Sequence, residues 1–143
     1  MQLSADDRLD IMELPGRYAD ALDRLEPDKL REVFTNEAEW ELVGGSLRLV
    51  GLDAIMEFMG RPEVHPGAHL MTNIYIASVA TDPSSGLVVH LCSRGVFPIG
   101  PSDRTNPSAV FYGRYDDDVV RSEAGWRIRH RPIPARIVMP RCA

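Results

Sequence analysis

"HLMTNIYIASVATDPSSGLVVHLCSRGVF", residues 69–97, contains two segments rich in β-branched and apolar residues with a turn between them. The turn, "DPSSG" at residues 82–86, combines aspartate, proline, serine and glycine, each of which favours reversal of the chain. The flanking segments suit a pleated, half-buried surface. The stretch therefore predicts two long strands that pair as an antiparallel hairpin.

Two further segments extend this pattern toward the C-terminus: "SAVFYGRYDDDVVRS", residues 108–122, and "WRIRHRPI", residues 126–133. We predict that they add two strands to an antiparallel meander. The aspartates at 116–118 lack the spaced oxygen ligands of a calcium loop, so they are interpreted as the exposed part of a strand edge. The alternating arginines of the last segment are interpreted as a solvated face: Arg127, Arg129 and Arg131.

Helical patterns precede these strands. Ser4 and Asp7 have the spacing of a helix start, and apolar positions follow at helical intervals. The Pro15–Gly16 pair predicts a kink there, or a break into two shorter helices. Pro27 suits the first position of a second helix, which we expect to end near Thr35.

A short hairpin and a third helix complete the pattern. Residues 37–42 alternate in polarity and are followed by the Gly44–Gly45 turn, which predicts pairing with residues 46–51. Residues 52–59 form an amphipathic helical pattern that Gly60 ends. Helices that precede a run of antiparallel strands favour an α+β fold, in which a curved sheet carries helices on one face. With 143 residues the chain has the length of one domain, residues 1–143.

Composition excludes several classes of function. A net charge of −5 argues against a non-specific partner of nucleic acid or of anionic membranes. No apolar run approaches the roughly 20 residues that span a bilayer, and the acidic start has no apolar signal core, so we expect a cytoplasmic protein. Cys92 and Cys142 are too few for a disulfide framework or a cysteine metal site, and we expect both to be reduced. Phosphate-loop, serine-hydrolase and paired metal-ligand motifs are absent from the sequence.

Isolated polar residues in apolar surroundings are the candidates for chemistry. In a regular strand His69, Met71, Asn73 and Tyr75 share one face, which we predict to be a pocket wall. His69 then acts as a catalytic base or, alternatively, is an ordinary structural histidine. Asp23 lies at the edge of the apolar stripe of the first helix, where it faces a pocket or caps the "EPDK" turn.

Two other histidines have the same two interpretations. His90 shares a strand face with Cys92, and His130 shares one with Trp126. Each is a buried, hydrogen-bonded core residue or a pocket residue, and the residues alone favour the core.

Four blocks, taken in order, resemble the SnoaL-like branch of the nuclear transport factor 2-like superfamily. They are "RYADALDRLEPDKLREVFTNEAEWELVGG", "GLDAIMEF", "HLMTN" and "GRYDDDVVRSEAGWRIRHR", which start at residues 17, 51, 69 and 113. The resemblance covers nearly the whole chain. It implies a cone-shaped, cystatin-like half barrel, in which about three N-terminal helices and a curved antiparallel sheet enclose a pocket.

The resemblance also implies roles for single residues. Scytalone dehydratase, bile acid 7α-dehydratase and hexachlorocyclohexane dehydrochlorinase use an aspartate that ends the first helix and a histidine that starts a strand, which correspond to Asp23 and His69. Tyr18 resembles a catalytic tyrosine of the bile acid enzyme. Leu22 replaces the tyrosine that precedes the aspartate in scytalone dehydratase, and Tyr18 lies near the position of a lysine in the dehydrochlorinase. The predicted substrate-binding residues are Arg136, in "ARIVM", with His90, Asn73 and Trp40.

The function implied is that of a lyase or isomerase without metal or cofactor, most simply a dehydratase, acting on a hydrophobic cyclic molecule of steroid, terpenoid or polyketide type. A histidine oriented by a carboxylate suits proton abstraction near neutral pH. Alternatives are a non-catalytic binding module or partner subunit, and a polyketide cyclase or epoxide hydrolase. The apolar C-terminal stretch "WRIRHRPIPARIVM" predicts a homodimer or homotrimer.

Overall fold

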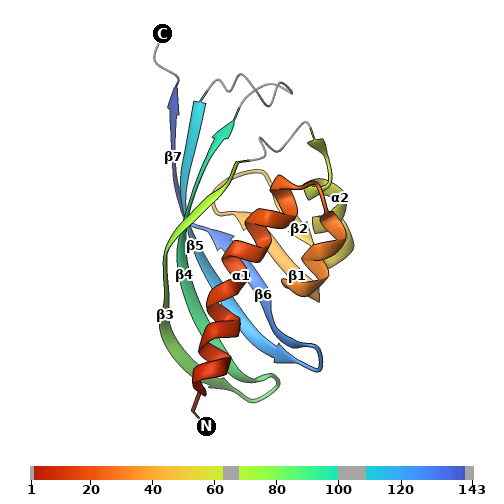
Figure 1. The fold of residues 1–143 in the computed structure, drawn as a ribbon, viewed down its shortest axis with the longest axis vertical. Helices are drawn as coiled ribbons and strands as arrows, with labels where there is room; N and C mark the ends of the chain where they lie inside the picture. Colours follow the sequence, from red (N-terminus) through yellow and green to blue (C-terminus); the bar gives the residue numbers. More distant parts are fainter. Residues whose placement is uncertain (1, 63–67, 100–108, 141–143) are drawn as a thin grey trace.

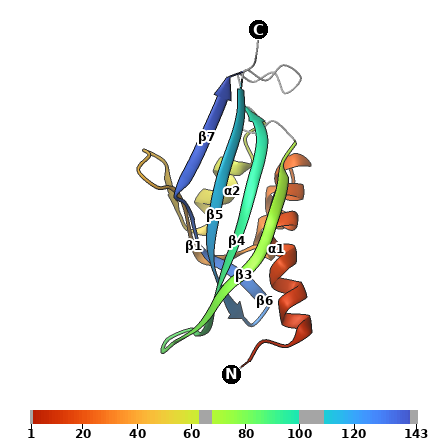
Figure 2. The same cartoon turned by 90° about the vertical axis from the view of Figure 1, so that its left-hand side faces the viewer.

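A curved sheet with helices against its concave face forms the molecule (Figure 1). The computed structural model describes residues 2–62, 68–99 and 109–140. The elements in chain order are α1 (Ala5–Asp23), the 3₁₀ helix η1 (Pro27–Glu32), β1 (Phe34–Leu42), β2 (Arg48–Val50), α2 (Leu52–Met59), β3 (Leu70–Asp82), β4 (Gly86–Ile99), β5 (Ala109–Ser122), β6 (Gly125–Ile133) and β7 (Ala135–Pro140). Figure 2 shows α2 behind the sheet and α1 along its β3 edge. The predicted α+β fold with a curved, unclosed sheet is confirmed.

The sheet is mixed, whereas the sequence predicts an antiparallel one. Its strands follow the order β2-β1-β6-β5-β4-β3, and β7 pairs with β5. β1 runs parallel to β6, while the other strand pairs among the described residues are antiparallel. β7 was missed because its short sequence has no turn signal ahead of it other than Pro134. β6 pairs with β5 on one side and with β1 on the other. The chain then turns back, and β7 pairs with the first half of β5.

Helix α1 begins as predicted and then continues through its proline. Ser4 and Asp7 form a complete capping box, with the Ser4 hydroxyl accepting from the Asp7 amide at 3.0 Å. Of the two outcomes predicted at Pro15–Gly16, a kink or a break into two helices, the break is wrong, because α1 is one helix from Ala5 to Asp23. Proline removes one backbone hydrogen bond, but the helix buries a full stripe of side chains against the sheet, and such packing supplies most of the stability of a helix in a protein.

The second predicted helix is shorter than expected. η1 ends at Glu32, and β1 already starts at Phe34, before the expected end at Thr35. The Val33 carbonyl accepts a hydrogen bond from the Ile128 amide at 2.7 Å. Pairing with β6 therefore takes over the backbone where the sequence alone suggests continued helix.

The alternation of β6 is reversed by a bulge at Arg129. Asp118 pairs with His130 and Val119 with Ile128, so Arg129 is the extra residue. A bulge of one residue moves every later side chain to the opposite face. Ile128 is inward before it, and Arg131 and Ile133 are inward after it.

The interpretation of Arg131 and of the aspartate run as surface groups is therefore wrong. Arg131 and Asp117 are both fully buried and form a bidentate pair, with distances of 2.8 Å from Nε to Oδ1 and 2.6 Å from Nη2 to Oδ2. The guanidinium carbon lies 4.3 Å from the centre of the Tyr18 ring and 4.9 Å from that of Tyr115. β5 is also an interior strand and not an edge.

Candidate active site

A cavity of about 160 Å³ lies between the concave face of the sheet and the helices. Its wall is largely aromatic, with Tyr18, Trp40, Phe58, Phe97, Phe111 and Tyr115, and is completed by Leu42, Met59, His69 and Ile133. The lining comes from α1, α2 and four strands, together with His69 just before β3. An apolar cavity with few polar groups is the usual form of a small-molecule site.

His69 and Asp23 meet at this wall although they are 46 positions apart. The His69 Nδ1 lies 2.6 Å from Asp23 Oδ1, and the His69 backbone amide donates to Asp23 Oδ2 at 2.9 Å. The imidazole is only 1% exposed. The predicted meeting of the two residues is confirmed, and Asp23, the last residue of α1, contacts the start of the sheet instead of capping a surface turn.

This contact determines which nitrogen of His69 is basic. A carboxylate accepts hydrogen bonds, so Asp23 holds a proton on Nδ1 and leaves the lone pair on Nε2. Burial lowers the pKa of His69, and the opposing effect of Asp23 does not cancel it. The imidazole is thus neutral near pH 7, as proton abstraction requires.

Two rings flank the imidazole. The Phe97 ring centre lies 4.4 Å from that of His69, and the Tyr18 ring meets His69 edge-on at 6.5 Å. These ring contacts and the two hydrogen bonds to Asp23, one from the ring and one from the backbone amide, hold the His69 side chain in place.

Tyr18 and Trp40 add two donors to the cavity wall. Burial raises the pKa of Tyr18, which keeps its hydroxyl protonated, while the nearby Arg131 and Trp40 act in the opposite direction. Within the described residues the hydroxyl has a contact of 3.9 Å to Met59 Sδ, and the buried indole N–H of Trp40 makes no hydrogen bond of good geometry. An unpaired buried donor is costly, and a ligand acceptor would relieve that cost.

A model of the SnoaL-like domain matches residues 4–132. The chain belongs to the SnoaL-like domain family. This confirms the predicted branch of the nuclear transport factor 2-like superfamily. No curated protein matches the chain in sequence.

Solved structures share the fold of this SnoaL-like domain. A protein from Novosphingobium aromaticivorans, provisionally named an aromatic ring hydroxylase, is 25% identical with a TM-score of 0.73, and 96% of each chain is covered. A provisionally named scytalone dehydratase from the same organism is 20% identical with a TM-score of 0.71, over 98% of this chain and 93% of that one. Hexachlorocyclohexane dehydrochlorinase type 3 from Novosphingobium barchaimii is 18% identical with a TM-score of 0.76, and the match covers 98% of this chain and 96% of that one. The last two show the fold alone.

Three predicted substrate-binding residues of this SnoaL-like domain, Asn73, Arg136 and His90, do not line the cavity. A register shift between Thr72 and Tyr75 places Asn73 at a positive φ of 52°, so Asn73 and Tyr75 are exposed and Ile74 packs on the core instead. The predicted shared face of His69, Asn73 and Tyr75 is therefore wrong, because the shift reverses the alternation. Arg136 is exposed on β7.

His90 and His130 are neither core nor pocket residues in the SnoaL-like domain. His90 lies on the convex face, 37% exposed, with Nδ1 3.3 Å from Asp118 Oδ1. His130 is 35% exposed, and its Nε2 lies 2.9 Å from Glu41 Oε1. The core interpretation fails for His90 because Val89 and Leu91 take the inward positions of β4, and for His130 because of the bulge at Arg129.

Other lining residues of the SnoaL-like cavity were not predicted from the sequence, among them Phe97 and Tyr115. The alternation of β5 from Phe111 to Tyr115 is a signal that could have found one of them. Cys142 lies outside the described residues. No helix in the described part of the chain is long and apolar enough to cross a membrane.

Proposed function

We propose that this SnoaL-like protein is a lyase or isomerase that needs no cofactor, most simply a dehydratase, and that His69 is its base. The observation that carries the proposal is the hydrogen bond between Asp23 and the buried imidazole of His69 at the wall of an aromatic cavity. Such a pair supplies a neutral imidazole with a fixed tautomer and stabilises the imidazolium that forms.

In the proposed elimination Nε2 of His69 removes a proton from a carbon next to a carbonyl. The electron pair of the broken C–H bond forms the double bond, and the C–O bond to the leaving hydroxyl breaks. The imidazolium then returns its proton to the leaving hydroxide, which departs as water. Tyr18 and Trp40 donate hydrogen bonds to the oxygen on which negative charge develops.

The hydrogen bonds between Asp23 and His69 favour His69 over Asp23 as the base. Asp23 already accepts from the His69 ring and backbone, so its oxygens face the histidine. An epoxide hydrolase or cyclase that uses an aspartate base fits this arrangement less well, because the carboxylate would have to leave these bonds to reach a substrate.

The cavity favours a cyclic, largely apolar substrate. Its volume of about 160 Å³ is similar to that of an engineered protein cavity of roughly 150 Å³ that binds benzene, so it has room for one ring. The aromatic wall suits stacking against an unsaturated or carbonyl-conjugated ring. We propose a ring with a ketone and a β-hydroxyl as the reacting part of the substrate.

The test uses purified protein and a panel of hydroxylated cyclic ketones and sterol-like alcohols, with loss of water followed by mass spectrometry. We expect His69→Ala to lower turnover by about 10²- to 10⁴-fold. Asp23→Asn should cause a loss that does not add to the first, because the two residues act as a unit. His130→Gln, at a half-buried site outside the cavity, is the matched control. Equal product from wild type and His69→Ala would exclude the proposed base, and ligand binding without turnover would favour a binding module.

A further inference from the structure

The convex face of the sheet brings together three residues whose side chains can bind a metal. His90 and Cys92 come from β4, and Asp116 comes from β5, where it pairs directly with Cys92. One ligand atom from each lies within 4.8 Å of the others. The side chains lie on the face opposite the cavity, since Val89 and Leu91 of β4 are inward.

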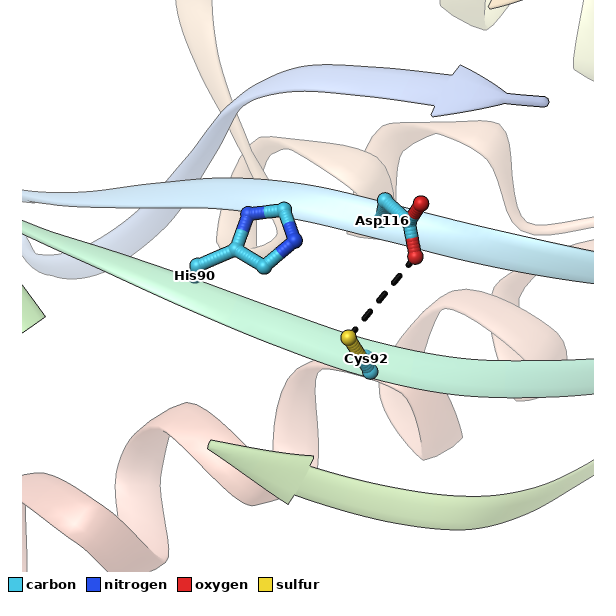
Figure 3. Close-up of side chains that lie close together, drawn as sticks. All are labelled: His90, Cys92 and Asp116. Carbon is cyan, nitrogen blue, oxygen red and sulfur yellow. Dashed lines mark hydrogen bonds between the residues drawn. The ribbon is translucent and has the colours of Figure 1, made fainter. Parts of the chain in front are cut away.

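Asp116 is oriented toward the thiol. Arg114 donates to Asp116 Oδ2 from Nε at 3.1 Å and also contacts it with Nη2 at 3.1 Å. The other oxygen, Oδ1, lies 3.7 Å from Cys92 Sγ, as Figure 3 shows. Arg114 therefore holds one carboxylate oxygen and leaves the other facing the cluster.

His90 is oriented in the same way by a second carboxylate. Its Nδ1 lies 3.3 Å from Asp118 Oδ1. The imidazole is directed toward Asp116 and Cys92 (Figure 3), which makes Nε2 the nitrogen that faces them. A histidine whose far nitrogen contacts a carboxylate is the usual arrangement behind a zinc ligand, because the carboxylate fixes the tautomer and makes the ligand nitrogen more basic.

We propose that His90, Cys92 and Asp116 bind one divalent cation of the zinc class through imidazole nitrogen, thiolate sulfur and carboxylate oxygen. A mixed N, S and O set favours Zn²⁺ over the hard cations Mg²⁺ and Ca²⁺. On binding, the Cys92 thiol proton passes to solvent. Water fills the fourth position, because all three residues are partly exposed.

The geometry and the local charge fit this ion. Ligands about 2.0–2.3 Å from a tetrahedral zinc lie roughly 3.3–3.8 Å from each other. The Cys92–Asp116 distance of 3.7 Å is already in this range, and the partly exposed His90 closes the rest by side-chain rotation. The carboxylates of Asp116 and Asp118 and the Cys92 thiolate carry three negative charges, which outweigh the two guanidinium groups on this face, those of Arg114 and Arg94. A cation is therefore favoured.

The test is a titration of the reduced, metal-free full-length protein with Co²⁺ as the only metal. A thiolate bound to Co²⁺ gives an absorption band in the near ultraviolet. We expect the band to saturate at one Co²⁺ per chain, and Zn²⁺ to abolish it by displacement. Cys92→Ser should remove the band, whereas Cys142→Ser, which alters the other cysteine, should keep it.

Matched variants separate ligands from bystanders. His90→Gln and Asp116→Asn should each weaken Zn²⁺ binding more than about 100-fold, and Asp118→Asn, which alters only the group behind the histidine, by about 10-fold. His130→Gln and His69→Ala should leave the affinity unchanged, which also separates this site from the cavity. Circular dichroism checks that each variant is folded. Absence of the band in wild type, its persistence in Cys92→Ser, or equal affinity in His90→Gln would overturn the proposal.

Discussion

At the scale of single residues, Tyr18 is a donor whose ring meets the imidazole of the proposed base edge-on at 6.5 Å. Burial raises the pKa of its hydroxyl, which keeps it protonated, and the hydroxyl contacts Met59 Sδ at 3.9 Å. Tyr18→Phe keeps the ring over Arg131 and removes only the donor. We expect kcat to fall by about 10²-fold with little change in KM, because a donor to a developing oxyanion acts in the transition state. Steady-state kinetics measure this, and an unchanged kcat would contradict the role.

The pH profile of the reaction reports the environment of His69. Burial lowers its pKa below the ordinary value of 6.5, so kcat/KM should stay level as pH falls through 7 and decline only below 6.5. Asp23→Asn removes the charge that stabilises the imidazolium, so the decline should move to lower pH still. An acid limb centred above pH 6.5 would show that His69 is not the titrating base.

The lowered pKa of His69 also makes the stability of the fold depend on pH. Because the folded-state pKa of His69 is lowered, the unfolded chain binds more protons as pH falls from 6.5 toward that lower value. His69 therefore contributes stability above the unfolded pKa, and the contribution is lost on acidification through this window. Urea unfolding of wild type and His69→Gln at several pH values measures it, and the difference between the two should shrink on acidification.

At the scale of elements, the Asp117–Arg131 pair joins β5 to β6 inside the core. Removing one partner leaves a buried charge uncompensated, so Asp117→Leu should lower the free energy of unfolding by about 3–5 kcal/mol. The double variant Asp117→Leu with Arg131→Met should recover most of this loss, because no charge is then buried. Urea unfolding tests both. A double variant as unstable as the single one would mean that packing, and not charge, governs the site.

The register shift in β3 predicts a second effect on stability. Asn73 has a positive φ that β-branched side chains strongly disfavour. Asn73→Val should therefore cost roughly 1–2 kcal/mol, whereas Asn73→Gly should be tolerated. Thermal unfolding compares the two variants. Equal melting temperatures would indicate that the residue relaxes to an extended conformation.

At the scale of the whole molecule, β7 leaves apolar side chains exposed. Ile137, Val138 and Met139 are 58%, 50% and 48% exposed. Successive strand residues point to opposite faces, so at residues 137–139 neither face of β7 is covered by the part of the chain that the structure describes. We predict a homodimer or homotrimer that covers this strand, and Val138→Lys should shift it toward monomer. Light scattering at micromolar concentration measures this, with the exposed Val79→Lys on β3 as control; a monomeric wild type would contradict it.

The sequence by itself determined the types of most elements, though not β7, and its resemblance to the SnoaL-like family predicted the pairing of Asp23 with His69. Local signals carry this information: the Ser4 capping box, the "DPSSG" turn, and the order of blocks that identified the SnoaL-like family. The alternation of side chains along a strand predicts the inward residues correctly in the regular parts of β4 and β5, where every second residue is buried.

Only the tertiary structure decided which side chains face the cavity beyond a bulge. One extra residue at Arg129 turns Arg131 inward, and the shift near Asn73 turns that residue out, because side-chain direction depends on pairing between strands and not on spacing along one strand. The cluster of His90, Cys92 and Asp116 has the same origin. Its members are scattered in the sequence, and the β4–β5 register places them together on one face.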